Sequence, residues 1–189
     1  IASVRKRKFR VAIDCCNGAG SLVTEKFLRE LGCEVVAINN EPNGIFPHDP
    51  EPIASNLGQL SQVVKENSVD IGFAQDADAD RLAIVSGKGE PIGEDYTLAL
   101  CTEFVLRKKP GLVVISLSTT RAIDDIAKKY KSTVVRTRVG DVNVTEYLKD
   151  NHGVIGGEGN GGVVVPEIHY AQDSFVAIAT ILQFMTITG

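Results

Sequence analysis

Short apolar runs alternate with amphipathic stretches throughout the first half of the sequence. The apolar residues of 22–31 recur at helical spacing, and the stretch ends at Gly32, a residue type common just after helices. Residues 53–64 show the same periodicity, after a long polar and proline-rich segment that we interpret as a loop. The remaining apolar runs indicate strands at residues 9–13, 34–38, 69–74 and 82–85.

The same alternation begins again after residues 87–90, the glycine-rich segment GKGE. It predicts helices at residues 96–107, 120–129, 141–149 and 173–185, and strands at 112–116, 133–137, 154–155 and 163–165. Alternating strands and helices favour mostly parallel sheets with helices on their faces. We therefore expect an α/β protein of two consecutive three-layer α/β domains with mixed, mostly parallel sheets, residues 1–88 and 89–189.

The composition is that of an ordinary soluble globular protein, with 189 residues, 43% hydrophobic and 23% charged. A net charge of −4 and a pI near 5.4 argue against a general nucleic-acid binder, so we interpret the basic run at residues 5–8 as a solvated lead-in to the first strand. No apolar run approaches the ~18 residues of a membrane-spanning helix, so no membrane partner is expected. The sequence begins at Ile1 rather than Met, which indicates a piece of a longer protein.

Cysteine and histidine spacing excludes several kinds of site. The cysteines show neither C-x-x-C spacing nor a disulfide framework, which favours reduced thiols in a cytoplasmic protein; they are Cys15, Cys16, Cys33 and Cys101. No G-x-S-x-G segment is present, so a hydrolase triad is unsupported. The histidines are isolated in sequence, and we expect solvated loop or helix-edge positions for His48, His152 and His169.

Three aspartates alternate with alanine in the segment FAQDADADRLAIVSG, between two predicted strands. Unit charges about 5 Å apart repel by about 3 kcal/mol at an effective dielectric near 20, so this crowding requires either a cation or free exposure to water. The favoured interpretation is a hard divalent cation, Mg²⁺, held by Asp76, Asp78 and Asp80. A splayed, solvated acidic turn is the alternative.

Two other interpretations of the aspartates fail on the neighbouring residues. An EF-hand loop needs Gly at its sixth position and Glu at its twelfth, where this sequence has Arg81 and Gly87. A single nucleophilic aspartate after a strand would leave Asp80 and Arg81 without a role.

Two glycine-rich segments are candidate ligand loops. CCNGAGS, residues 15–21, lacks the third glycine of a dinucleotide fingerprint and the Gly-Lys-Ser/Thr of a P-loop, so alone it favours a tight structural turn. GGEGNGG, residues 156–162, combines five glycines with Glu158 and Asn160, whose polar groups suit adjacent sugar hydroxyls. A flexible hairpin turn is the alternative for this second segment.

Five segments in order give the sequence a specific resemblance: DCCNGAGS, PNGIFPHDPEP, DADADR, TRVGD and GGEGNGG. Together they resemble the α-D-phosphohexomutases, the family of phosphoglucomutase, phosphomannomutase and phosphoglucosamine mutase, along the whole chain. DADADR resembles the family's metal loop, usually D-G-D-x-D-R, and GGEGNGG resembles its sugar loop, usually G-G-E-x-S-G. The resemblance implies the second and third of four domains.

The resemblance also implies a role for each motif residue. Asp76, Asp78 and Asp80 would bind Mg²⁺, Arg81 would brace the phosphoserine or the bound substrate, and Arg138 would lie near the reacting phosphate. The residues for the sugar are Gly157, Glu158 and Asn160. Two positions depart from the family pattern: Ala77 replaces a glycine and Asn160 replaces a serine. Alanine would be strained if position 77 required a positive φ.

The implied reaction interconverts a hexose 1-phosphate and 6-phosphate through a phosphoserine and a bisphosphorylated sugar. Relatives carry the phosphoserine in the first domain and the main phosphate-binding loop in the fourth, and neither motif occurs in this sequence. The expected partners are therefore a hexose phosphate and the two missing domains, and the chain alone is expected to be inactive. A non-catalytic sugar-phosphate-binding module and a nucleotide-binding α/β domain are the alternatives.

Overall fold

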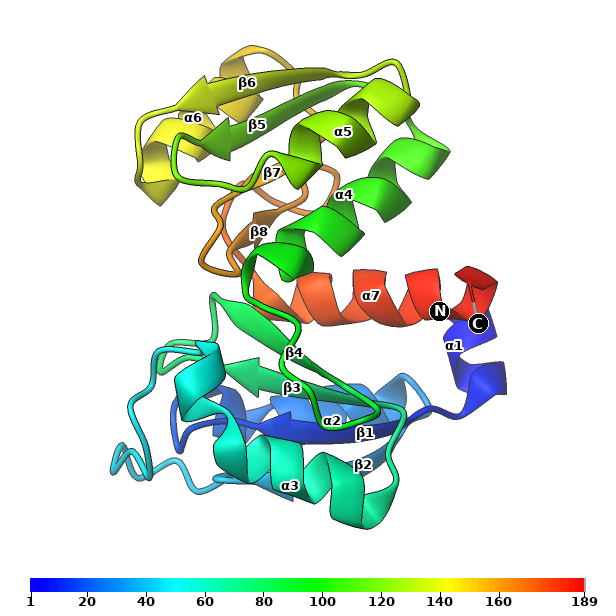
Figure 1. Cartoon of the computed structure of the whole chain (residues 1–189), viewed down its shortest axis with the longest axis vertical. Coiled ribbons are helices and arrows are strands. Elements are labelled where there is room, and N and C mark those ends of the chain that lie inside the picture. Colours follow the sequence, from blue (N-terminus) through cyan, green and yellow to red (C-terminus); the bar gives the residue numbers. More distant parts are fainter. Residues whose placement is uncertain (189) are drawn as a thin grey trace.

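The computed structural model describes residues 1–188, which form two α/β halves (Figure 1). The first half consists of α1 (Ala2–Arg7), β1 (Arg10–Asp14), η1 (Ala19–Leu22), α2 (Thr24–Glu30), β2 (Glu34–Ile38), η2 (Ala54–Asn56), α3 (Gly58–Asn67), β3 (Ile71–Gln75) and β4 (Leu82–Ser86). The second half consists of α4 (Asp95–Lys108), β5 (Leu112–Ser116), α5 (Ala122–Lys129), β6 (Thr133–Thr137), α6 (Asp141–Asp150), β7 (Ile155–Gly157), β8 (Val163–Val164) and α7 (Ser174–Thr188). The elements η1 and η2 are short 3-10 helices.

Both halves contain a four-stranded sheet of the same topology. The strand orders are β2-β1-β3-β4 and β6-β5-β7-β8. In each sheet the first three strands along the chain run parallel and the last pairs antiparallel with the third. The predicted fold class, two α/β domains with mixed, mostly parallel sheets, is confirmed.

Side chains that alternate along the strands bury both faces of each sheet, as the two-residue period of a strand requires. In β1, Val11 and Ile13 face the core shared with α2 and α7, whereas Ala12 faces α3. In β5, Val113 and Ile115 face the shared core and Val114 packs with α6. Each half is therefore a sheet covered by helices on both sides (Figure 1).

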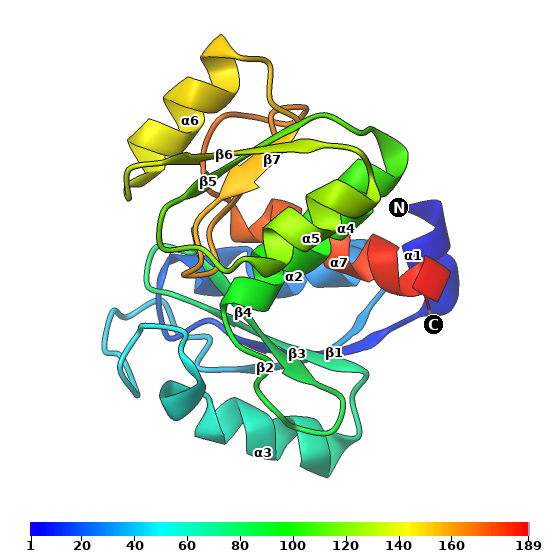
Figure 2. The same cartoon turned by 45° about the horizontal axis from the view of Figure 1, so that its top comes forward.

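Helix α7 lies between the two sheets and joins the halves into one body (Figures 1 and 2). It contacts β4 of the first half and α4 and β8 of the second. One apolar core accordingly contains Phe73 and Leu82 together with Leu98 and Ile178. The parallel strands of both sheets point the same way in Figure 1, so their carboxyl ends face the same side of the molecule.

Two local details differ from the expectations. The basic residues 5–8 are exposed, as expected of a solvated lead-in, but residues 5–7 belong to α1, a helix that was not predicted, which buries Val4 and packs against α7. The helix expected at residues 53–64 is divided into η2 and α3, and α3 continues to Asn67. Among residues 1–188, no helix is long and apolar enough to cross a bilayer.

Candidate metal and sugar site

The loop between β3 and β4 gathers the three aspartates for which a cation was predicted. One carboxylate oxygen from each of Asp76, Asp78 and Asp80 lies within 4.8 Å of the others. Asp76 is buried, Asp80 is half-buried and Asp78 is exposed, so the cluster opens from the end of β3 toward solvent. The loop therefore presents a rim of oxygen ligands, the kind that Mg²⁺ prefers.

Asp80 carries the clearest sign of crowding among these carboxylates. Burial, and then the charge of Asp76, raises the pKa of Asp80 to about 7. The Oδ1 atom of Asp80 is buried and has no hydrogen-bond partner among residues 1–188. A hard divalent cation would supply the missing partner and offset the carboxylate charge that Arg81, with Nε 3.7 Å from this oxygen, leaves uncompensated, so the residues present fit Mg²⁺.

Arg81 braces the loop from the inside. Its Nε donates to Asp76 Oδ2 at 2.6 Å, and its backbone N–H donates to Asp76 Oδ1 at 3.1 Å. The Arg81 side chain is only 27% exposed. Burial lowers the pKa of Arg81, but the hydrogen bond to Asp76 and that carboxylate's charge outweigh it, so the pKa is raised and the guanidinium stays charged. The Arg81 guanidinium brings one positive charge to three carboxylates, so the loop keeps a net negative charge.

The backbone conformation of the loop shows that alanine at position 77 is not strained by a positive φ. The positive φ, 62°, belongs to Ala79, and Ala77 does not have one. The carbonyl of Ala77 accepts a hydrogen bond from the backbone N–H of Ala19 at 2.8 Å. A Cβ at Gly18 would collide with that carbonyl, so glycine is needed for this close approach. The CCNGAGS segment thus supports the metal loop, as expected of a structural turn.

The glycine loop GGEGNGG lies directly against the metal loop. The backbone N–H of Leu82 donates to the carbonyl of Gly161 at 3.2 Å, and Arg81 and Gly162 form an isolated antiparallel bridge. Two motifs from different halves of the chain are therefore joined through their backbones. The fold brings together the predicted metal residues and the predicted sugar residues.

Glu158 is the buried anchor of this glycine loop. Only 7% of the residue is exposed. Its Oε1 accepts from the backbone N–H of Gly140 at 2.8 Å, and its Oε2 accepts from Gln172 Nε2 at 3.2 Å. Each carboxylate oxygen has a second lone pair that these contacts leave available. Asn160 Oδ1 accepts from the backbone N–H of Gly162 at 3.2 Å, which leaves the Asn160 amide NH₂ for a ligand.

The other two predicted residues occupy different environments. Gly157 is buried at the end of β7, where it pairs with β8. Arg138 is exposed, and within residues 1–188 its guanidinium has no ion-pair partner. Its loop is tied to the site because the neighbouring Gly140 donates to Glu158. Gln172, which holds Glu158, was not predicted; a lone Gln in a polar loop gave no signal.

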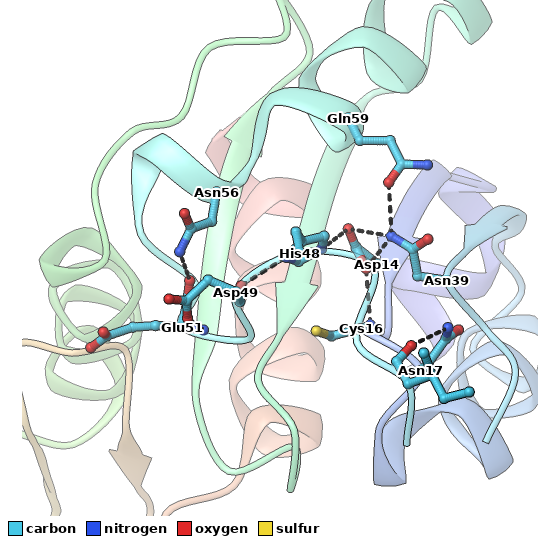
Figure 3. Close-up of polar contacts among 10 residues, drawn as sticks. Asp14, Cys16, Asn17, Asn39, His48, Asp49, Glu51, Asn56 and Gln59 are labelled. Atoms are coloured by element: carbon cyan, nitrogen blue, oxygen red, sulfur yellow. Dashed lines mark hydrogen bonds and ion pairs between the residues drawn. The ribbon is translucent and has the colours of Figure 1, made fainter. Parts of the chain in front are cut away.

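A third loop, residues 39–53, reaches the metal loop from β2. Asp14, buried at the end of β1, accepts from the Cys16 backbone N–H at 2.9 Å and from Asn39 Nδ2 at 3.0 Å. Figure 3 shows His48 between Asp14 and Asp49, with Nε2 3.0 Å from Asp14 Oδ2 and Nδ1 2.8 Å from the Asp49 carbonyl oxygen. His48 lies in a loop, as expected, but its side chain is only 19% exposed, so it is less solvated than expected.

Further along the same loop, Glu51 extends toward the metal loop. Its carboxylate lies 3.6 Å from Arg81 Nη1, and its backbone carbonyl accepts from Asn56 Nδ2 at 2.8 Å (Figure 3). The loop anchored by His48 therefore contributes a charged contact to the residue that braces the aspartates.

The stability of the protein should fall as pH rises through the pKa of His48. Both ring nitrogens of His48 face acceptors, so only the imidazolium satisfies both. Burial lowers its pKa, but the Asp49 carbonyl and the charge of Asp14 outweigh burial, and the net shift is upward. A pKa raised on folding stabilises the protein below the unfolded value of about 6.5, and this stabilisation is lost above the folded pKa.

Urea unfolding at about pH 5.5 and about pH 8.5 measures this loss. We expect a smaller difference between the two pH values for His48→Gln than for wild type. His152→Asn, at an exposed histidine, should keep the wild-type difference. Asp80 titrates in all three proteins, so it cancels in the comparison. A His48→Gln protein with the full wild-type difference would contradict the assignment.

Comparison with known proteins finds relatives along the whole chain. The family model described as phosphoglucomutase/phosphomannomutase, alpha/beta/alpha domain II, matches residues 1–89, and that of domain III matches residues 93–189. A phosphoglucomutase/phosphomannomutase of Thermococcus kodakarensis is 42% identical over 191 residues, which cover 100% of this chain and 42% of the relative. A probable phosphoglucosamine mutase of Methanococcoides burtonii is 42% identical over 186 residues, covering 98% of this chain and 42% of the relative.

Solved structures agree with this sequence similarity. The crystal structure of a putative phosphomannomutase from Thermus thermophilus superposes with a TM-score of 0.89 at 28% identity, over 100% of this chain and 44% of the other. The chain thus spans less than half the length of each of these proteins. Because two successive domain models match nearly all of it in order, the chain belongs to the phosphoglucomutase/phosphomannomutase family, as its domains II and III.

Proposed function

We propose that this chain is the central part of a phosphohexomutase that interconverts a hexose 1-phosphate and 6-phosphate. Residues 1–88 form the metal-binding domain and residues 89–189 the sugar-binding domain. A first domain would supply a phosphoserine, and a fourth domain would supply the main phosphate-binding loop. In the reaction the phosphoserine transfers its phosphoryl group to the free sugar hydroxyl, the bisphosphorylated sugar reorients, and its other phosphate returns to the serine.

The observation that carries this proposal is the backbone junction between the metal loop and the glycine loop. Leu82 and Gly161 are joined by a hydrogen bond of 3.2 Å, directly after the aspartates and within the GGEGNGG segment. Phosphoryl transfer is catalysed chiefly by positioning and electrostatics, which require the phosphate and the sugar hydroxyl to be held side by side. A cation-binding rim beside a set of sugar hydrogen-bonding groups meets that requirement.

The residues of the metal loop would hold Mg²⁺ and orient the transferring phosphate. Asp76, Asp78 and Asp80 supply the carboxylate oxygens, and Mg²⁺ bound there offsets charge on the transferring group. Arg81, fixed by Asp76, keeps its charge beside that phosphate. Arg138, exposed on the loop that Glu158 holds, is free to approach a phosphate from the other half of the chain.

The residues of the glycine loop would bind the sugar. Glu158 and Asn160 offer an acceptor and a donor two residues apart, as adjacent hydroxyls require. The backbone at Gly157 forms the floor of the same loop, because β7 leads directly into Glu158. The four cysteines are buried and unpaired, which supports a reducing compartment, the cytoplasm.

The substrate class is a hexose phosphate, and the preferred sugar is open to a direct assay. The two relatives are named for glucose and mannose phosphates and for glucosamine phosphate respectively. Steady-state kinetics of the full-length parent with glucose, mannose and glucosamine 1-phosphates, with and without Mg²⁺, would rank these substrates. Loss of activity in EDTA and recovery with Mg²⁺ are expected for each accepted sugar.

The isolated 189-residue chain should bind Mn²⁺ or Mg²⁺ but show no mutase activity. It holds the cation ligands, but it contains no segment resembling the phosphoserine motif, and removal of a covalent nucleophile removes the pathway. Purification from a host that lacks its own phosphohexomutases excludes contamination. Conversion of glucose 1-phosphate to glucose 6-phosphate by that preparation would contradict the proposal.

A further inference from the structure

A chain of buried polar side chains runs from α2 through the end of β3 to the start of α7. Thr24 Oγ1 donates to Gln75 Oε1 at 2.8 Å, and Gln75 Nε2 donates to Ser174 Oγ at 2.7 Å. Ser174 Oγ in turn donates to the backbone carbonyl of Ala79. All three side chains are at most 1% exposed. The chain of hydrogen bonds therefore ends on the metal loop, between Asp78 and Asp80.

The hydrogen bonds of the network run in one direction, from Thr24 to the carbonyl of Ala79. The Gln75 amide accepts once through oxygen and donates once through nitrogen, and the Ser174 hydroxyl accepts one bond and donates its only proton. Gln75 faces α7 because it shares the face of β3 that carries Phe73 into the shared core. Loss of the Ser174 hydroxyl would remove the partner of Gln75 Nε2 and the side-chain partner of the Ala79 carbonyl.

The metal loop needs such a support at Ala79. A residue with a Cβ is disfavoured at positive φ, and this conformation persists only where the surrounding structure holds it. The N–H of Ala79 donates to the Asp76 carbonyl at 3.2 Å, and its carbonyl is held by Ser174. A separate hydrogen bond, from the backbone N–H of Ala19 in the glycine turn, holds the carbonyl of Ala77. The alanines that separate the aspartates are thus held by two different segments of the chain.

We propose that Ser174, oriented by Gln75, is a positioning residue that fixes the three aspartates in the arrangement that binds a divalent cation. Ser174 begins α7, which packs on both halves, so the same bond ties the metal loop of the first half to the framework of the second. The proposal rests on the proposed metal site, and the experiment below separates the two.

The test is the Mn²⁺ affinity of the 189-residue chain, measured by the electron paramagnetic resonance signal of free Mn²⁺. Ser174→Ala is expected to weaken binding about 10- to 100-fold, the usual effect of removing a group that orients metal ligands. Ser174→Thr, which keeps the hydroxyl, should restore most of the affinity. Thr180→Ala, at another buried hydroxyl residue of α7, should bind as wild type does.

A second measurement needs no metal. Hydrogen exchange of the Ala79 and Arg81 amides, both of which donate to Asp76, should accelerate in Ser174→Ala and stay at the wild-type rate in Thr180→Ala. If Ser174→Ala does not fold, Ser174→Cys replaces it, since a thiol of similar size is a weak donor and should also weaken binding.

The outcomes are distinguishable. Wild-type Mn²⁺ affinity and amide exchange in a folded Ser174→Ala protein would overturn the positioning role while leaving the metal site in place. Equal Mn²⁺ binding by wild type and by Asp78→Asn, Asp80→Asn would overturn the metal site, and the positioning role with it.

Discussion

Replacement of both Asp78 and Asp80 by asparagine is expected to abolish divalent-cation binding by the chain and to lower kcat/KM of the full-length parent about 1,000-fold. A bound divalent ion supplies several kcal/mol of charge stabilisation to a transferring phosphate, and each 1.4 kcal/mol is a factor of ten. Asp76, which remains, is already paired with Arg81 and offers too few free oxygens to hold the ion. Calorimetry with Mg²⁺ and steady-state kinetics measure the two effects.

The matched control removes the same charge elsewhere. Asp125→Asn, Asp150→Asn changes two exposed carboxylates on α5 and α6 and should leave both measurements unchanged. The melting temperature of metal-free Asp78→Asn, Asp80→Asn should equal or exceed that of wild type, because repulsion among the carboxylates is relieved. Unchanged Mg²⁺ affinity in this variant would show that the loop is a solvated acidic turn.

Glu158→Gln in the full-length parent is expected to lower kcat/KM about 10- to 150-fold. A hydrogen bond to a charged group contributes about 1.5–3 kcal/mol, and that loss in transition-state stabilisation converts to this factor. Glutamine keeps the size of the side chain but replaces one acceptor oxygen with a donor, which also faces the donors of Gly140 or Gln172. The lost acceptor and the new donor both act on the glycine loop and not on the aspartates, so the Mg²⁺ affinity should stay unchanged.

Two companion variants separate sugar binding from a general effect on the loop. Glu167→Gln, at an exposed carboxylate beyond β8, should leave kcat/KM unchanged. Asn160→Ala should lower kcat/KM and leave melting temperature and Mg²⁺ affinity in place, since it removes a half-buried amide with a single internal bond. Wild-type kinetics in both Glu158→Gln and Asn160→Ala would reduce the glycine loop to a plain turn.

The strands were predictable because both faces of each sheet are covered. Such strands appear as short, uniformly apolar runs, and β1 and β5 lie within one residue of the expected ranges. Helix boundaries were less predictable, because the turn at Leu57 that separates η2 from α3 leaves the apolar periodicity intact. Helix α1 was missed because one buried residue, Val4, among basic residues gives no amphipathic pattern, and its stability comes from packing on α7.

The site was predictable where charge density was the signal. Asp76, Asp78 and Asp80 converge, as their crowding indicated. The backbone conformation was not predictable, since alternating alanines do not show whether Ala77 or Ala79 takes the positive φ. Their support by Ser174 was also hidden, because a serine at a helix start has many ordinary roles and its partner lies far away in sequence.

The contact between the metal loop and the glycine loop is a tertiary contact, and no local sequence pattern could predict it. It follows from the packing of α7 against both sheets, which places the start of β4 beside Gly161. A single polar residue at the end of an apolar strand, Gln75, was the available sign that this end of β3 meets a polar partner. Only the family resemblance indicated that the two motifs act together.

The central claim is that the two loops form one site for a hexose phosphate, and paramagnetic broadening tests it most directly. Mn²⁺ bound to the 189-residue chain should broaden the sugar-proton resonances of glucose 6-phosphate beyond the effect of free Mn²⁺. This excess should vanish in Asp78→Asn, Asp80→Asn, which cannot hold the ion. It should also fall sharply in Glu158→Gln, although that variant still binds Mn²⁺. Wild-type broadening in Glu158→Gln, at equal Mn²⁺ occupancy, would contradict the account.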